Sequence, residues 1–279
     1  MSKAIGWGAS RGLPVRLRGM MLSRFAQAYG IDLDEAEKPL ADYADFDELF
    51  TRRLRTGARP IADEPGGIVS PADGIVVECG LATEGKLIQA KGTLFDLSEL
   101  LSDGEIAARL VGGAYLITYL SPKDYHRVHS PVGGRVIGWR HIPGTLFSVG
   151  AKSVATEPGL FVRNERFVTL IEMDGGGLCA VVMVAAIGVG HVTVSYDAEV
   201  ATHRPRFLRA AVRHRHYDDP KPVRRGEELG IFHLGSTTIV VFEPGRAELG
   251  SFVAGEAMKM GIGIGRARAA NDISAVSRG

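Results

Sequence analysis

The densest group of side chains that could do chemistry lies in residues 125–131, where two histidines and an arginine stand between Pro122 and Pro131. Histidine is the natural general acid or base near neutral pH, and in an extended segment His126 and His129 face opposite sides and can do different jobs. No further histidine, cysteine or carboxylate stands at a convincing metal-ligand spacing, and the nearest spare histidines are His141 and His191. We predict acid–base residues without a metal; the alternative is ordinary surface or core histidines.

Two more residues add to this chemistry. Asp73 lies at the tip of a Pro-Ala-Asp-Gly turn, and Ser236 follows Gly235 just before the apolar run 238–242. Each feature alone is typical of a simple turn. A Gly-Ser bond on the rim of a rigid sheet is also a place where a backbone can cleave itself, because the serine hydroxyl can attack the preceding carbonyl. With His129 the chain holds a nucleophile, a base and an acid that orients the base.

The elements that must position these residues are mainly strands. From about residue 61 onward, short Val/Ile-rich runs alternate with glycine-containing turns, which favours a β-rich architecture. Residues 93–101 are expected to form a short helix, 121–131 a loop, and 203–225 a basic, irregular segment. We expect strands at 75–77, 114–120, 132–139, 145–149, 167–173, 178–189 and 238–242, with a hairpin turn at 174–177.

Residues 1–58 differ from the rest because their pattern is helical. A first helix is expected between Pro14 and Gly30, a second at 34–43, and a third at 46–54 capped by Asp45. One interpretation is a helical layer packed on the main domain. The other is an interfacial amphipathic segment that contacts anionic lipid through arginines and the anchors Trp7 and Phe25. The predicted apolar stripe of the first helix is Leu17, Met21, Phe25, Ala28 and Tyr29.

Composition narrows the class of protein. The 279 residues carry a net charge of +1, which gives no case for nucleic-acid binding. Cys79 and Cys179 match no metal or disulfide framework. No run approaches the 18 apolar residues of a membrane span, and no signal-peptide pattern begins the chain, so a cytoplasmic protein is the expectation. The sequence Glu-Ala-Met-Lys-Met around Lys259 resembles a biotin-attachment site, which leaves a non-catalytic carrier module as an alternative.

Several of these segments, in this order, resemble the pyruvoyl-dependent phosphatidylserine decarboxylase proenzymes. The resemblance covers most of the chain from Phe46 to about Gly265. The matching segments are 50–55 (Phe-Thr-Arg-Arg-Leu-Arg), 58–61 (Ala-Arg-Pro-Ile), 70–74 (Ser-Pro-Ala-Asp-Gly), 91–101, 125–131 (Tyr-His-Arg-Val-His-Ser-Pro), 143–149 (Pro-Gly-Thr-Leu-Phe-Ser-Val) and 226–237.

The resemblance implies a mechanism. Asp73 orients His129, which deprotonates Ser236, and Ser236 attacks the Gly235 carbonyl. The chain then splits into a β chain, 1–235, and an α chain, 236–279, and Ser236 becomes a covalent pyruvoyl cofactor. The ketone of that cofactor bonds to the amine of phosphatidylserine and serves as the electron sink when CO2 leaves. His126 returns a proton to the substrate, and phosphatidylethanolamine is released.

The expected fold is mainly β with an N-terminal helical layer (α+β) and mixed antiparallel sheets that form a barrel-sandwich-like core. Residues 1–58 would be the membrane-contact segment and 59–279 the catalytic domain, peripheral to the cytoplasmic side of the cell membrane. The two chains would form a heterodimer that dimerises further in one variant of this view. A pyruvoyl decarboxylase of a soluble amino acid is the alternative within the family. The chain departs from the family pattern at 189–193 (Val-Gly-His-Val-Thr) and in the basic block from His203 to Arg225.

Overall fold

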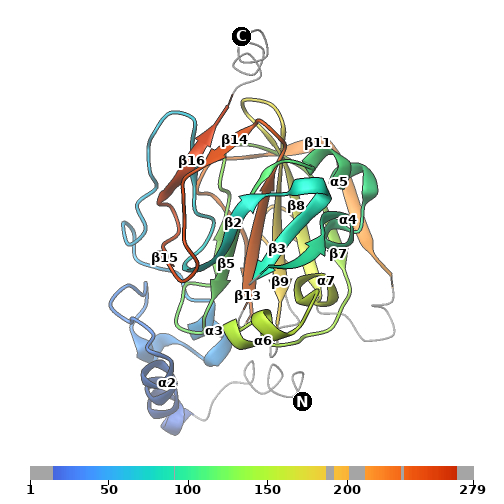
Figure 1. Cartoon of the computed structure of the whole chain (residues 1–279). Coiled ribbons are helices and arrows are strands. Elements are labelled where there is room, and N and C mark those ends of the chain that lie inside the picture. The colour runs from blue at the N-terminus through green and yellow to red at the C-terminus, as the bar shows by residue number, and fades with distance from the viewer. Residues whose placement is uncertain (1–14, 91, 187–191, 201–210, 234–235, 269–279) are drawn as a thin grey trace.

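The computed structural model describes residues 15–90, 92–186, 192–200, 211–233 and 236–268 (Figure 1). The fold is mainly β, with helices at the N-terminal end and several antiparallel sheets in a sandwich-like arrangement, as expected. The largest sheet contains, in spatial order, β11 (Arg213–Val223), β7 (Gly134–Ile142), β8 (Arg166–Met173), β9 (Leu178–Ala185), β13 (Ser236–Phe242), β5 (Ala114–Leu120), β2 (Gly74–Leu81) and β15 (Ala257–Met258).

The centre of this sheet is formed by strands that are apolar on both faces. Every residue of β9 and of β13 is buried. Because successive side chains of a strand point to opposite faces, Val181 and Met183 join one hydrophobic cluster while Val182 and Val184 join another. A continuous apolar run is what a strand covered on both sides requires. The two clusters are the two halves of the main core.

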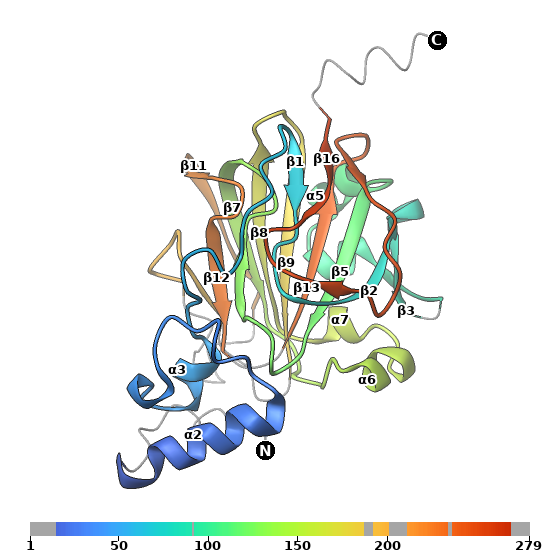
Figure 2. The same cartoon turned by 90° about the vertical axis from the view of Figure 1, so that its left-hand side faces the viewer.

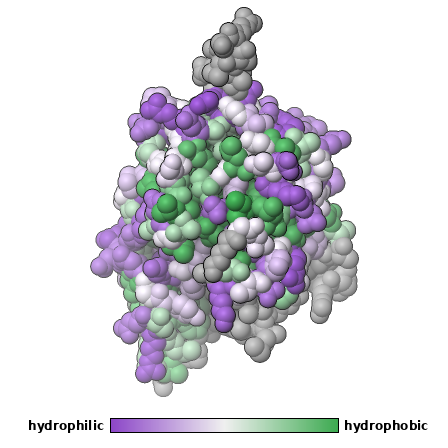
Figure 3. Space-filling model, in the orientation of Figure 1, coloured by the Kyte–Doolittle hydropathy of each residue, from purple (hydrophilic) through white to green (hydrophobic). Residues whose placement is uncertain are grey.

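Smaller elements cover the two faces. One cluster includes residues of β1 (Gly67–Val69), β16 (Gly263–Ala267) and β14 (Ala247–Leu249), and of a second sheet formed by β10 (Val192–Val194), β12 (Glu228–Phe232) and β6 (Arg127–His129). The other cluster includes residues of β3 (Lys86–Ala90), β4 (Thr93–Asp96), α4 (Leu97–Leu101), α5 (Gly104–Leu110), α6 (Ala151–Thr156) and α7 (Leu160–Arg163). Figure 3 shows apolar residues gathered in the middle of the face that carries β2 and β3.

The N-terminal helices have a small core of their own. α2 (Val15–Tyr29) begins after Pro14 and ends at Gly30, whose φ is +70°. Its buried residues are Leu22 and Ala26, which pack with Ile31, Tyr43 and Leu49. α3 (Phe46–Phe50) is capped by Asp45, whose carboxylate accepts a hydrogen bond from the Glu48 N–H. Figures 1 and 2 place α2 and α3 at the same end of the sheets as α6.

The predicted stripe of the first helix is partly wrong. Met21 and Phe25 are half-buried, but Leu17 and Tyr29 are 48% exposed. The buried stripe is displaced by one position because the helix packs on its own small cluster through Leu22 and Ala26. In the described part of the chain, no helix combines the length and apolarity needed to cross a membrane.

Other corrections concern segments whose structure depends on distant partners. Residues 34–43 contain only the 3-10 turn η1 (Leu40–Asp42), and 93–101 divides into β4 and α4. Residues 145–149 form a single bridge, Thr145 to Asn164, rather than a strand. The expected loop 121–131 contains β6, and the expected irregular segment contains β11, because β12 and β7 pair with them. Residues 203–210 and the tail from 269 lie outside the described residues.

The hairpin prediction is confirmed. β8 and β9 pair antiparallel, with Glu172 opposite Leu178, around the turn at 174–177. β9 was predicted to extend to residue 189, but it ends at Ala185 and Ala186 lies outside the strand; residues 187–189 lie outside the described residues.

Candidate active site

Ser236 begins the central strand of the sheet. In β13 it lies opposite Leu120 of β5 on one side and Ala185 of β9 on the other. It is fully buried, and its Oγ has no hydrogen-bond partner in the part of the chain that is described. A buried hydroxyl without a partner costs free energy and calls for an explanation. The predicted cleavage position, between Gly235 and Ser236, includes a residue outside the described ranges.

Asp73 lies in the turn that leads into β2, at the end of the sheet where β13 also begins. Gly74 follows it with a φ of +151°, and a Cβ there would lie 2.2 Å from the Tyr119 carbonyl oxygen. The absence of a side chain at Gly74 therefore lets this turn approach β5 closely. Because β5 separates β2 from β13, two interstrand spacings place the backbones of Asp73 and Ser236 about 10 Å apart.

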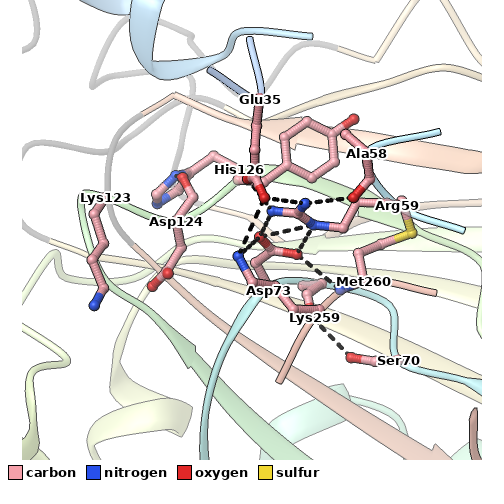
Figure 4. Close-up of polar contacts among 12 residues, drawn as sticks. Glu35, Ala58, Arg59, Ser70, Asp73, Lys123, Asp124, His126, Lys259 and Met260 are labelled. Atoms are coloured by element: carbon pink, nitrogen blue, oxygen red, sulfur yellow. Dashed lines mark hydrogen bonds and ion pairs between the residues drawn. The ribbon is translucent and has the colours of Figure 1, made fainter. Parts of the chain in front are cut away.

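Asp73 is almost fully buried and makes several charge-assisted hydrogen bonds (Figure 4). The Arg59 guanidinium donates to both carboxylate oxygens, with Nη2 lying 2.6 Å from Oδ2 and Nε 2.8 Å from Oδ1. The backbone N–H of Met260 donates to Oδ1 at 2.8 Å, and the Lys259 ammonium lies 3.6 Å from Oδ2. The carboxylate is thus held on several sides by cationic or polar donors.

His129 ends β6 and has partners on both ring nitrogens. Nδ1 lies 2.8 Å from the Gly226 carbonyl oxygen, which can only accept, so Nδ1 carries the proton. Nε2 lies 3.2 Å from the Tyr125 hydroxyl, which donates to it when the ring is neutral. Burial lowers the pKa of His129, although the hydrogen bond to Gly226 and the charges of Glu228 and Asp73 oppose the shift. The structure therefore holds a neutral imidazole whose Nε2 is a base.

His126 lies just before β6 and is fully buried beside Phe50, with ring centroids 3.8 Å apart. Its Nδ1 donates to the Asp124 carbonyl at 2.8 Å, and its Nε2 has no partner among the described residues. Burial lowers the pKa of His126 to about 3, and the nearby Arg52 acts in the same direction. The ring is neutral at physiological pH, and Nε2 presents a free lone pair.

The backbone brings these four residues to one region without joining their side chains directly. The His129 N–H donates to the Pro71 carbonyl at 2.8 Å, two residues before Asp73. The Phe232 N–H donates to the His126 carbonyl at 3.0 Å, four residues before Ser236. No hydrogen bond recorded for the described residues links the side chains of Asp73, His129, Ser236 and His126 to one another.

Several residues of this region were not predicted from the sequence to belong to the site. Arg59 and Tyr125 lie in segments that resemble the family, but nothing in the sequence assigns them as the partners of Asp73 and His129. Glu35, which binds the other side of Arg59 at 2.6 Å, carries no sequence signal because it comes from an ordinary acidic segment. The described residues contain no group of three or more histidine, cysteine or acidic side chains placed to hold a metal ion.

Comparison with known proteins identifies the family. The family model for phosphatidylserine decarboxylase matches residues 46–266. A phosphatidylserine decarboxylase proenzyme of Anaeromyxobacter sp. (strain K) is 46% identical over 273 residues, which cover 96% of this chain and 94% of the relative. Proenzymes of the same name from Myxococcus xanthus and Bordetella avium are 39% and 43% identical, covering 95% and 88% of this chain and 93% and 83% of the relatives. The chain belongs to the phosphatidylserine decarboxylase family.

As a member of the phosphatidylserine decarboxylase family, the chain is an enzyme, and the family named from its motifs is confirmed. Membership decides against the biotin-carrier alternative. The structure gives Lys259 another environment, since its ammonium lies 3.6 Å from Asp73 and 3.9 Å from Glu35. Cys79 and Cys179 are free thiols, of which Cys179 is buried and Cys79 is half-buried.

Proposed function

We propose that the protein converts phosphatidylserine to phosphatidylethanolamine and CO2 after cleaving itself between Gly235 and Ser236. Family membership supports the reaction. The observation that supports the cleavage is the Ser236 hydroxyl, which is fully buried without a partner at the start of the central strand. A hydroxyl whose hydrogen-bonding capacity is unused is available to a base.

The cleavage is an acyl shift followed by an elimination. Ser236 Oγ bonds to the Gly235 carbonyl carbon, the peptide C–N bond breaks, and the hydroxyl proton passes through His129 to the released nitrogen. Loss of the Ser236 Cα proton then breaks the Cβ–O bond and leaves Gly235 as a carboxylate. Water displaces the nitrogen as ammonia, which leaves residues 1–235 and 236–279 as separate chains with residue 236 converted to a pyruvoyl group.

The residues around Ser236 fit such a group. Ser236, Thr237 and Thr238 are all buried, and their hydroxyls have no hydrogen-bond partner among the described residues. When present, the pyruvoyl group supplies a conjugated carbonyl that accepts the electrons released with CO2.

We assign different roles to the two histidines. His129 is the base of maturation, supported by the negative charge of Asp73, and it must exchange its Nε2 contact with Tyr125 for Ser236 to take up the proton. His126 handles the substrate proton. Because the pKa of His126 is about 3, the ring is neutral, so Nε2 must first take up a proton, which the ammonium group of phosphatidylserine supplies, before it returns one to the product.

The helical end of the molecule is suited to a lipid surface. Leu17, Met20 and Tyr29 of α2 are each 48% exposed. His233, three residues before Ser236, lies 2.9 Å from Asp47 of α3, so the cleavage region lies beside the N-terminal helices. We propose that residues 1–58 place this end against the cytoplasmic face of the membrane as a peripheral contact, and that 59–279 form the catalytic domain.

Intact-mass analysis of the purified protein tests the proposal. We expect two fragments, with the smaller one blocked to N-terminal sequencing and lighter than a serine-initiated peptide. Protein incubated with phosphatidylserine in detergent should release CO2, whereas free serine should not be a comparable substrate. An uncleaved wild-type chain that still decarboxylates would disprove the pyruvoyl mechanism.

Three variants separate the roles. Ser236→Ala and His129→Ala should remain single chains without activity, because the nucleophile or its base is missing. His126→Ala should be cleaved but lose most decarboxylation, by roughly a hundredfold or more for an acid–base residue. A His126→Ala enzyme with full activity would remove this residue from the substrate step.

A further inference from the structure

The carboxylate of Asp73 belongs to an ion network built from three separate parts of the chain. Glu35 comes from the N-terminal segment, and Arg59 and Asp73 lie in the first part of the proposed catalytic domain. Lys259 and Met260 follow the proposed cleavage position. The side chains of Arg59 and Asp73 are 6% and 2% exposed. Figure 4 shows the guanidinium of Arg59 between the two carboxylates.

The guanidinium uses its two edges for different acids. Nε and Nη2 donate to Asp73, while Nη1 and Nη2 donate to Glu35 at 2.9 and 2.6 Å. A planar fork of fixed geometry sets both the distance and the plane of a bound carboxylate, which a lysine cannot do. Arg59 is therefore oriented by Glu35 and in turn orients Asp73.

The backbone defines the remaining side of Asp73. The Met260 N–H lies 2.8 Å from Oδ1, in the stretch that resembles a biotin-attachment site. A Cβ on the next residue, Gly261, would lie 2.7 Å from the Pro60 carbonyl oxygen, so this stretch passes close to the residue after Arg59. Arg59 and the Met260 amide thus bind the Asp73 carboxylate from two sides.

The network also compensates for the burial of the Asp73 carboxylate. Taking a carboxylate out of water is unfavourable unless a cation and hydrogen bonds compensate for the lost hydration. Burial lowers the pKa of Arg59, but the hydrogen bonds to Asp73 and Glu35 outweigh burial and raise it. The hydrogen bond to Arg59 lowers the pKa of Glu35. Burial lowers the pKa of His129, while the hydrogen bond to Gly226 and the charges of Glu228 and, to a lesser extent, Asp73 favour its protonated form.

We propose that Arg59 is a positioning residue for self-cleavage: held in place by Glu35, it fixes the orientation of the Asp73 carboxylate for its action on His129. This inference rests on the proposed role of Asp73. It goes further by making the N-terminal segment, through Glu35, part of the maturation machinery. The guanidinium geometry is required as well as the charge.

The test measures the rate of self-cleavage of freshly refolded chain by mass spectrometry over a range of pH. Arg59→Met should cleave roughly a hundredfold more slowly, since misplacement of a catalytic group by about 1 Å has effects of that size. Arg59→Lys should remain slow, by about tenfold, because the charge is restored without the fork. Glu35→Gln should have a smaller effect in the same direction.

Arg166 supplies the matched control. It is also buried, and its guanidinium donates to backbone carbonyls far from Asp73, those of Leu100, Val162, Asn164 and Glu99. Arg166→Met should reduce thermal stability as much as Arg59→Met but leave the cleavage rate per folded molecule and its pH profile unchanged. Arg59→Met should change the pH profile as well as the rate, because it removes the cation that binds the Asp73 carboxylate.

The outcomes separate this inference from the proposed function. If the wild-type chain does not cleave, or if Asp73→Asn cleaves at the wild-type rate, the proposed function or the role of Asp73 is wrong. If wild type and Asp73→Asn behave as expected but Arg59→Met matches Arg166→Met in rate and pH profile, Arg59 is merely structural and the inference alone is overturned.

Discussion

Asp73 and Ser236 are buried equally well, yet their surroundings are opposite. Both Asp73 oxygens accept hydrogen bonds, from Arg59 and from the Met260 amide. Ser236 Oγ and His126 Nε2 have no partner among the described residues. Because a folded protein normally satisfies its buried polar atoms, the difference separates the supporting side of the site from its reacting side. The Asp73 oxygens are thus held in position, whereas Ser236 Oγ and His126 Nε2 are free to take part in a reaction.

The comparison is sharpest when both sides are tested for stability in the same uncleaved chain, Ser236→Ala. In that background, Asp73→Ala should lower the free energy of unfolding by about 3 kcal/mol or more, because it leaves Arg59 buried with only Glu35 as a counter-charge. The Ser236→Ala chain should be at least as stable as the His129→Ala chain, which also remains uncleaved. Urea unfolding measures both. A cost below about 1 kcal/mol for Asp73→Ala would contradict the supporting role.

The pH dependence of stability tests the reacting side. The pKa of His126 is about 3 in the folded chain and near 6.5 when it is exposed, so the unfolded chain takes up the proton first. Neutral His126 contributes its full share to the free energy of unfolding above pH 6.5. This share declines as the pH falls toward 3, by up to about 1.4 kcal/mol per pH unit.

Urea unfolding of the Ser236→Ala chain between pH 6.5 and 5 should show this decline, above the range where Glu35 titrates. His126→Phe, which preserves the contact with Phe50, should remove most of the slope. The lowered pKa of His129 leaves a remainder of the same sign. Equal slopes in the two chains would show that His126 is not buried as a neutral ring.

The smallest effect should come from the hydroxyls beside Ser236. Thr238→Val removes a buried Oγ1 without a partner in the described structure, so stability should stay within about 0.5 kcal/mol or rise. Thr169 is the matched control on β8: its Oγ1 lies 2.8 Å from the Tyr196 hydroxyl, and Thr169→Val should cost about 1–2 kcal/mol. Similar losses in both variants would show that Thr238 has a partner in solution.

The strands that are apolar on both faces were predictable because burial alone defines them. β5 and the hairpin of β8 and β9 begin and end close to their predicted positions. β6 and β11 were missed because their polar sequences become strands only through pairing with β12 and β7. The predicted helix at 34–43 failed for a related reason, since the chain there turns back and bridges Ala36 to Leu54.

The motifs of the sequence determined the family, and the types of its candidate residues determined the chemistry they can perform. An acid, two histidines and a serine after glycine have those properties wherever they lie. Tertiary structure alone decided which of these groups have hydrogen-bond partners. The hydrogen bonds from Arg59 to Asp73 join residues 14 positions apart. The orientation of this pair also depends on Glu35 and Met260, which come from opposite ends of the chain. Hydrogen bonding and desolvation depend on distances in space, and the order of residues does not specify them.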